Sequence, residues 1–193
     1  MRYEMDKYTL KKKEIVDVMV SLMDEEGLKK VTVKDICKTA NISIGSFYHY
    51  FESKDSIVED MYKLMDEFFL VNESKIKSHE MVSEQIIGFV NHFGIYVEKW
   101  GYYGNLLIMS SSVKVKNQNH NSDRAVYSIL KSIIEEGIAN KQFKVSIDVD
   151  ELVAIIFALM RGHLLEWIKR EHDYKVREKM VTHTKYIVGY LCI

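Results

Sequence analysis

Polar side chains suited to nucleic-acid binding gather in one short stretch of the sequence, residues 43–49. The stretch holds two serine hydroxyls, a tyrosine phenol and an imidazole, and it has no apolar stripe of its own. Such groups hydrogen-bond to phosphate oxygens and to base edges, and an aliphatic side chain can contact the methyl group of thymine. The candidate DNA-contacting residues are Ser43, Ile44, Gly45, Ser46, Tyr48 and His49.

Two short helices are expected to position these side chains. Residues 32–40 and 43–50 are joined by a tight turn at Asn41-Ile42, which is typical of a helix-turn-helix. Ala40 is small, as a close approach of the two helix backbones requires. The amino end of the second helix offers free N–H groups and a positive dipole, which suit a phosphate. The alternative, a helical hairpin inside a bundle, does not explain the polar second helix. The side chains expected to pack inward are Ile36, Ile42 and Phe47.

The overall charge does not by itself indicate a nucleic-acid binder. The formal net charge is −1 and the sequence pI is about 6.7. Within residues 29–54, however, five lysines stand against two carboxylates. This local excess of positive charge is compatible with binding to a phosphate backbone, although it does not require it.

The whole sequence predicts an all-α fold. It contains no proline and only 9 glycines, and apolar residues recur at helical spacing throughout. We expect an amino-terminal helix-turn-helix domain of three helices over residues 1–53. A larger helical domain should follow over residues 54–193, with the helix at 54–77 as the connector. The nine expected helices cover residues 8–26, 32–40, 43–50, 54–77, 81–100, 103–113, 123–140, 148–172 and 175–191, and a loop is expected at 114–122.

The run TVKDICKTANISIGSFYHYFESK, residues 32–54, resembles the signature of the TetR family of bacterial transcription regulators. The close match covers residues 10–65. The remainder is similar only in its number of helices and in IIEEGIANKQF, residues 133–143, before a long apolar helix. The resemblance implies a homodimeric repressor that binds a near-palindromic double-stranded DNA operator and responds to a small effector. Whether the effector releases or promotes DNA binding is left open.

The resemblance also assigns roles to individual residues. Thr32 and Lys34 would contact phosphate at the start of the first helix of the motif. The residues from Ser43 to Ser46 would enter the major groove, with Tyr48 on a base or a phosphate. The residues that would hold the DNA backbone are His49, Tyr50 and Lys54. Ile44 departs from the family, because many members have a polar or basic residue there; we expect a methyl contact at that position.

The helix expected at residues 148–172 is apolar on nearly all sides, so it must be central or shared with a second subunit. The resemblance favours the second option, with residues 148–172 and 175–191 of two chains forming a four-helix interface. Gly162 would allow the two backbones to approach closely. We expect a charge introduced at Leu164 or Ile156 to disrupt this interface.

Large soft side chains of the second domain could line an effector pocket, although aromatic residues at helical spacing more often form a core. No charge stands alone on an apolar face, which favours an apolar or aromatic effector. We expect this effector to act by displacing the helix at 54–77. The candidate effector-binding residues are Phe68, Phe89, His92, Phe93, Tyr96, Trp100, Met109, Met160, His163 and Trp167.

The sequence disfavours two other classes of protein. A helical interaction module without DNA binding is disfavoured by the intact stretch at residues 43–54. An enzyme is disfavoured because the sequence lacks GxGxxG, P-loop, HExxH and GxSxG motifs. His163 and Glu166 have a spacing used by metal sites on helices, but no second pair accompanies them. We therefore expect no catalytic residue, no cofactor and no metal.

The expected location is the cytoplasm. Cys37 and Cys192 form no CxxC motif or disulfide framework, which fits a reducing compartment. The amino terminus lacks the apolar segment of a signal peptide. The longest apolar run, residues 152–160, is too short to span a bilayer, so we expect no membrane partner.

Overall fold

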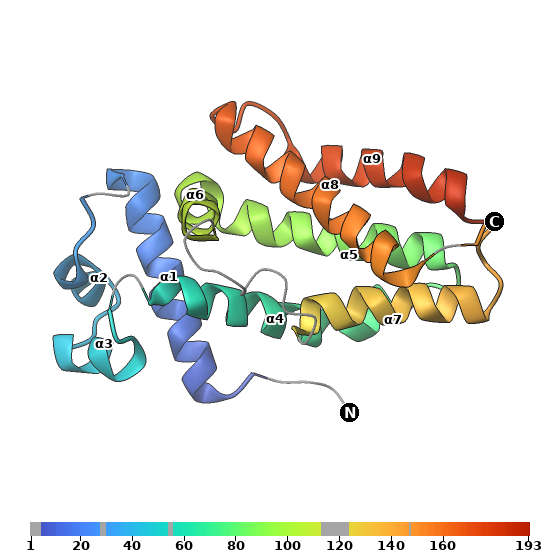
Figure 1. Cartoon of the computed structure of the whole chain (residues 1–193). Helices are drawn as coiled ribbons and strands as arrows, with labels where there is room; N and C mark the ends of the chain where they lie inside the picture. The colour runs from blue at the N-terminus through green and yellow to red at the C-terminus, as the bar shows by residue number, and fades with distance from the viewer. Residues whose placement is uncertain (1–4, 28–29, 54–55, 113–123, 147) are drawn as a thin grey trace. The chain divides into compact units, whose positions relative to one another are not determined.

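The computed structural model describes residues 5–27, 30–53, 56–112, 124–146 and 148–193. Within these ranges it contains nine helices and no strand beyond an isolated bridge between Phe143 and Cys192 (Figure 1). The predicted all-α class is therefore confirmed. The loop expected at 114–122 lies outside the described residues. The helices are α1 (Lys7–Glu26), α2 (Val33–Thr39), α3 (Ile44–Tyr50), α4 (Ile57–Ile76), α5 (Val82–Lys99), α6 (Gly101–Ser112), α7 (Ala125–Ala139), α8 (Val149–Lys169) and α9 (Val176–Leu191).

Side-chain caps explain where the short helices begin. The Thr32 hydroxyl accepts a hydrogen bond from the backbone N–H of Asp35, and the Asp35 carboxylate accepts one from the N–H of Thr32. This reciprocal capping box starts α2. Ser43 caps α3 by accepting the N–H of Ser46 at 2.9 Å. Asp6 caps α1 in the same way. The caps predicted at Thr32 and Ser43 are thus confirmed.

The chain divides into two compact units. The first contains α1, α2, α3, α6 and the part of α4 up to Glu67; the second contains the rest of α4, from Phe68, together with α5, α7, α8 and α9. The core of the first unit includes Ile15, Met19 and Phe47, none of which is exposed. In the second unit, α5 packs against both α7 and α9. A single continuous helix, α4, therefore contributes to both units.

Aromatic rings fill much of the second unit. Phe89 is fully buried, and its ring centroid lies 4.7 Å from that of Phe69 and 6.1 Å from that of Phe157. The Phe157 ring stacks in turn on Tyr127 at 4.0 Å. These contacts join α4, α5, α7 and α8 through one aromatic cluster.

Gly137 marks the closest packing between α7 and α5. A Cβ at this position would lie 2.5 Å from Cγ2 of Val82, a distance that real side chains do not adopt. We expect Gly137→Ala to lower the free energy of unfolding by about 1–3 kcal/mol, because overpacking forces the helices apart. Thermal unfolding followed by circular dichroism measures the effect.

Gly88→Ala is the matched control. A Cβ there meets only the Ile76 carbonyl oxygen, at an ordinary 3.8 Å. Because alanine favours the helix over glycine, this variant should be as stable as the native chain or more stable. A Gly137→Ala protein that also kept its full stability would contradict the close packing of α5 and α7.

Candidate nucleic-acid interface

The second helix of the motif, α3, has one buried side and one exposed side. Phe47 of α3 is fully buried and Ile42, in the turn before the helix, is half-buried, while Ile44 and Tyr48 are 52% and 54% exposed. Ile36 of α2 is fully buried beneath them. The predicted division is confirmed for Ile36 and Phe47, which face inward, and for Ile44 and Tyr48, which face outward. Two large, partly apolar side chains are left facing solvent on a seven-residue helix.

The two serines at the start of α3 already form hydrogen bonds that stabilise the helix. The Ser43 hydroxyl accepts the N–H of Ser46 and lies 2.8 Å from the Ser46 hydroxyl. Ser43 is exposed and Ser46 is half-buried. Each hydroxyl oxygen has further hydrogen-bonding capacity, so the pair can contact a ligand while it caps the helix.

Gly45 is a glycine that the chain's own packing does not require. It is exposed, and a Cβ built on it would meet only the Ser43 hydroxyl, at 3.7 Å. A glycine inside a helix costs about 1 kcal/mol relative to alanine. The missing side chain of Gly45 therefore leaves open space on the outer surface of α3, and no residue in the described part of this chain fills that space.

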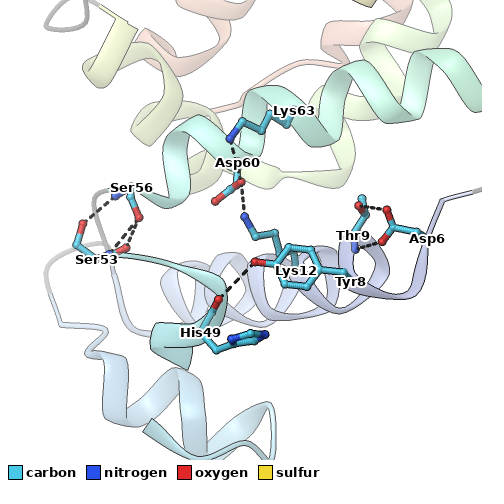
Figure 2. Close-up of polar contacts among 9 residues, drawn as sticks. All are labelled: Asp6, Tyr8, Thr9, Lys12, His49, Ser53, Ser56, Asp60 and Lys63. Carbon is cyan, nitrogen blue, oxygen red and sulfur yellow. Dashed lines mark hydrogen bonds and ion pairs between the residues drawn. The ribbon is translucent and has the colours of Figure 1, made fainter. Parts of the chain in front are cut away.

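The carboxyl end of α3 packs against α1 through a residue that the sequence did not single out. The Tyr8 hydroxyl donates to the backbone oxygen of His49 at 3.4 Å (Figure 2). The Tyr8 ring also lies 5.0 Å from that of Tyr50. Tyr50 is half-buried by this packing, whereas His49 is exposed. Tyr8 lies 41 residues from His49, so no local pattern signals the contact.

The remaining candidates flank α3. Thr32 is exposed but engaged with Asp35, and hydrogen bonds from the Thr32 side chain and backbone lower the pKa of the Asp35 carboxyl. Lys34 is exposed on α2. Lys54, a predicted backbone contact, lies outside the described residues. The structure therefore brings Ser43 to Tyr50 together on one helix and leaves Thr32 and Lys34 at the start of another.

The candidate effector residues belong to both compact units. Phe68, Phe89, His92, Phe93, Tyr96, Met160, His163 and Trp167 lie in the second unit, whereas Trp100 and Met109 lie in the first. The Phe68 ring packs against His92 at 6.2 Å and Tyr96 at 5.3 Å. Most of these side chains are buried, as they would be in a packed core or a closed pocket.

His163 and Glu166 each have another partner in the structure. Nε2 of His163 lies 3.0 Å from Nδ1 of His183, and Glu166 pairs with Lys169 at 3.6 Å. Burial, with smaller contributions from His183 and Lys179, lowers the pKa of His163 and favours its neutral form. The described residues contain no group of three or more His, Cys, Asp or Glu side chains placed to hold a metal ion. Cys37 and Cys192 are buried free thiols.

One half of α8 faces away from the rest of its own unit. Ile156 and Leu164, where we expected an added charge to disrupt a subunit interface, are 0% and 4% exposed and pack inside the chain itself. A charge at either position would therefore disturb the core. The large apolar side chains exposed on α8 are instead Ile155 and Leu165.

Of the helices in the described ranges, none combines the length and apolar character needed to cross a membrane.

Comparison with known proteins identifies the motif. Residues 15–61 match the family described as bacterial regulatory proteins, tetR family. The fatty acid metabolism regulator protein of Bacillus subtilis is 24% identical over 165 residues, which cover 83% of this chain and 85% of that protein. The transcriptional repressor KstR2 of Rhodococcus jostii is 40% identical over 57 residues, or 29% of this chain and 28% of the repressor.

Solved structures share the fold over nearly the whole chain. The transcriptional regulator FadR of Bacillus subtilis, in complex with stearoyl-CoA, superimposes with a TM-score of 0.73 at 22% identity, covering 92% of this chain and 98% of that one. The fatty acid degradation regulator FadR of Bacillus halodurans gives a TM-score of 0.74 at 19% identity, covering 96% of each chain. These relatives are regulators and not enzymes. The helix-turn-helix of this chain lies within residues 15–61, which match the tetR family of bacterial regulatory proteins, and the chain as a whole is similar to regulators with this fold.

Proposed function

We propose that the protein is a repressor that binds a near-palindromic operator as a homodimer and is released from it by a long-chain acyl-CoA. The observation that carries the DNA-binding part is the outer surface of α3. Ile44 and Tyr48 are exposed there, and the glycine between them leaves a gap in the surface. Hydroxyl and aliphatic groups around a gap of this kind suit close approach to a DNA groove.

Gly45→Ala tests the role of that gap. Alanine should stabilise α3 slightly, by up to about 1 kcal/mol, because its Cβ meets no obstacle within the chain. The same methyl group should weaken operator binding, because it fills the space that the DNA would occupy. Thermal unfolding and fluorescence anisotropy with DNA from upstream of the protein's own gene measure the two effects on one sample.

Ile138→Ala serves as a control, since it shortens an exposed side chain of α7. It should change neither operator affinity nor helicity. If Gly45→Ala bound the operator as tightly as the native chain, the outer surface of α3 would not be the DNA-contacting surface.

The homodimer is supported by the outer faces of α8 and α9. Ile155 and Leu165 are 49% and 41% exposed on α8, and Tyr186 and Tyr190 are 73% and 75% exposed on α9. Tyr186 and Tyr190 are four residues apart and share one face of α9, whereas Ile155 and Leu165, ten residues apart, lie about 80° from each other around α8. Exposed apolar residues that gather in this way mark an interaction surface.

The same faces carry two glycines that the chain does not need for itself. A Cβ at Gly162 of α8 or at Gly189 of α9 would meet nothing within 4 Å. Both lie inside helices, where glycine is unfavourable. Small residues on an exposed apolar face permit two helix backbones to pack closely, so a second copy of this chain is the partner that we propose for it.

Leu165→Asp should convert the dimer into a monomer. The native protein should have a mass of about twice 22.7 kDa in solution. An aspartate buried in an apolar interface without a partner costs several kcal/mol. Val145→Asp, at an exposed apolar residue before α8, should leave the mass unchanged. Light scattering measures the mass of each protein in solution. A native protein with the mass of a monomer would refute the proposed dimer.

The acyl-CoA effector is suggested by the likeness to the Bacillus subtilis FadR complex and by the chemistry of the second unit. Its interior is aromatic and apolar, as a fatty acyl chain requires. Beside the aromatic cluster, Arg161 donates to the Tyr127 hydroxyl at 2.7 Å and lies 5.5 Å from the centre of the Phe157 ring. No carboxylate among the described residues pairs with Arg161. A half-buried guanidinium in this setting is suited to an anionic group on the effector.

Addition of stearoyl-CoA should weaken operator binding, whereas coenzyme A alone should not, because only the acyl chain gains from burial in the apolar interior. Arg161→Gln should reduce the response to stearoyl-CoA while leaving operator affinity without effector unchanged. Arg170→Gln is the matched control, since Arg170 already pairs with Asp173 at 2.9 Å. Anisotropy titrations measure both quantities.

Two outcomes would contradict different parts of the proposal. An operator complex that is indifferent to stearoyl-CoA would exclude this effector class and leave the DNA-binding part intact. A native protein that binds no DNA but remains a dimer would favour a helical interaction module instead.

A further inference from the structure

A part-buried ion pair joins the first helix to the start of the connecting helix. Asp60, one turn into α4, is 7% exposed, and its Oδ1 lies 2.7 Å from Nζ of Lys12 on α1 (Figure 2). Lys63 approaches the same oxygen at 3.7 Å, but its side chain is 72% exposed. The close partner of Asp60 is therefore Lys12.

Aromatic rings fix the Lys12 ammonium in place. Nζ lies 5.4 Å from the ring centre of Tyr8 and 5.3 Å from that of Phe51, within cation–π range of both. Phe51 is the C-cap residue of α3, and its backbone N–H donates to the Phe47 oxygen. Lys12, which belongs to α1, thus contacts both the residue that ends α3 and the first turn of α4.

Tyr8 extends this junction along α3. It lies one helical turn before Lys12, so both side chains are on the same face of α1. Its hydroxyl donates to the His49 oxygen, and its ring packs on Tyr50. The face of α1 that holds α4 through Lys12 therefore also holds the carboxyl end of α3 through Tyr8.

The energetics of buried ion pairs suggest what this junction does. Replacing both members of such a pair by apolar residues is often neutral or stabilising, so the pair is a weak source of stability. It is more demanding in geometry, because both charges must meet their partners after losing water. In some proteins a buried polar or ionic contact of this kind determines which helix packing is adopted.

We propose that the Lys12–Asp60 pair is a positioning contact that sets the recognition helix α3 against the start of α4. Operator affinity then depends on the pair although neither side chain contacts DNA. The proposal rests on the operator binding proposed above. It adds Lys12, Asp60 and Tyr8 to the residues that determine DNA binding.

The double variant Lys12→Met/Asp60→Leu tests the proposal, because it removes both charges and keeps the apolar volume. Its melting temperature and dimeric mass should match those of the native protein, while its operator affinity should fall by about tenfold or more. The salt dependence of binding should keep its slope, since no phosphate contact is lost. The single variant Lys12→Arg, which keeps a cation opposite Asp60, should retain most of the native affinity.

Lys63→Met is the control for loss of a lysine near Asp60. Its exposed ammonium lies farther from the carboxylate, so the variant should bind the operator normally. A double variant with native stability and native affinity would overturn the proposal and assign the pair a purely structural role. A flattened salt dependence in Lys12→Met would also overturn it, because Lys12 would then be a phosphate contact.

Hydrogen exchange of the DNA-free protein keeps the test independent of the operator. In the double variant the α3 amides near Phe47 and Phe51 should exchange faster, while those in the middle of α5 should not change. If the double variant does not fold, Asp60→Asn is measured in the same way. Unchanged exchange in α3 would overturn the positioning role, even if the native protein proved to bind no DNA and the proposed function itself had failed.

Discussion

The recognition helix depends on contacts that it cannot supply itself. A helix of seven residues is too short to be stable alone in water, so α3 is held by the burial of Phe47 and Phe51, by the Ser43 cap and by Tyr8. Because two apolar rings carry most of the burial, three other side chains of the helix stay exposed. Ile44, Tyr48 and His49 can then face a ligand on a rigid support.

The same logic applies to the outer faces of α8 and α9. Their inner faces bury enough apolar surface to complete the second unit, with Ile156 and Met160 fully buried. The outer faces keep exposed apolar or aromatic side chains, Ile155 and Leu165 on α8 and Tyr186 and Tyr190 on α9, and each helix carries a glycine with open space around it. In each compact unit we assign a partner to exposed residues that the chain's own packing does not use. The partner is DNA for α3 in the first unit and a second subunit for α8 and α9 in the second.

Much of this arrangement could be predicted from the sequence because its signals are local. The caps at Thr32 and Ser43 and the apolar positions Ile36 and Phe47 lie within a few residues of what they determine. The Lys12–Asp60 pair spans 48 residues, so no periodicity reveals it. Tyr8 is equally remote from the helix that it supports.

The apolar helix α8 shows a second limit of sequence patterns. Apolar residues on nearly every side indicate that both faces are covered, but they do not say which face the chain covers by itself. Leu164 and Ile156 proved to be internal, while Ile155 and Leu165 are exposed. The aromatic candidates for the effector site have the same ambiguity, because a ring packed in a core and a ring lining a pocket recur at the same spacing.

Hydroxyl-radical footprinting on DNA from upstream of the protein's own gene tests the central claim most directly. A homodimer that inserts two copies of α3 into successive major grooves should protect two patches whose centres are about 10 base pairs, roughly 34–36 Å, apart. The patches should be related by the near-palindrome of the sequence. A single protected patch, or protection without dyad symmetry, would contradict the account.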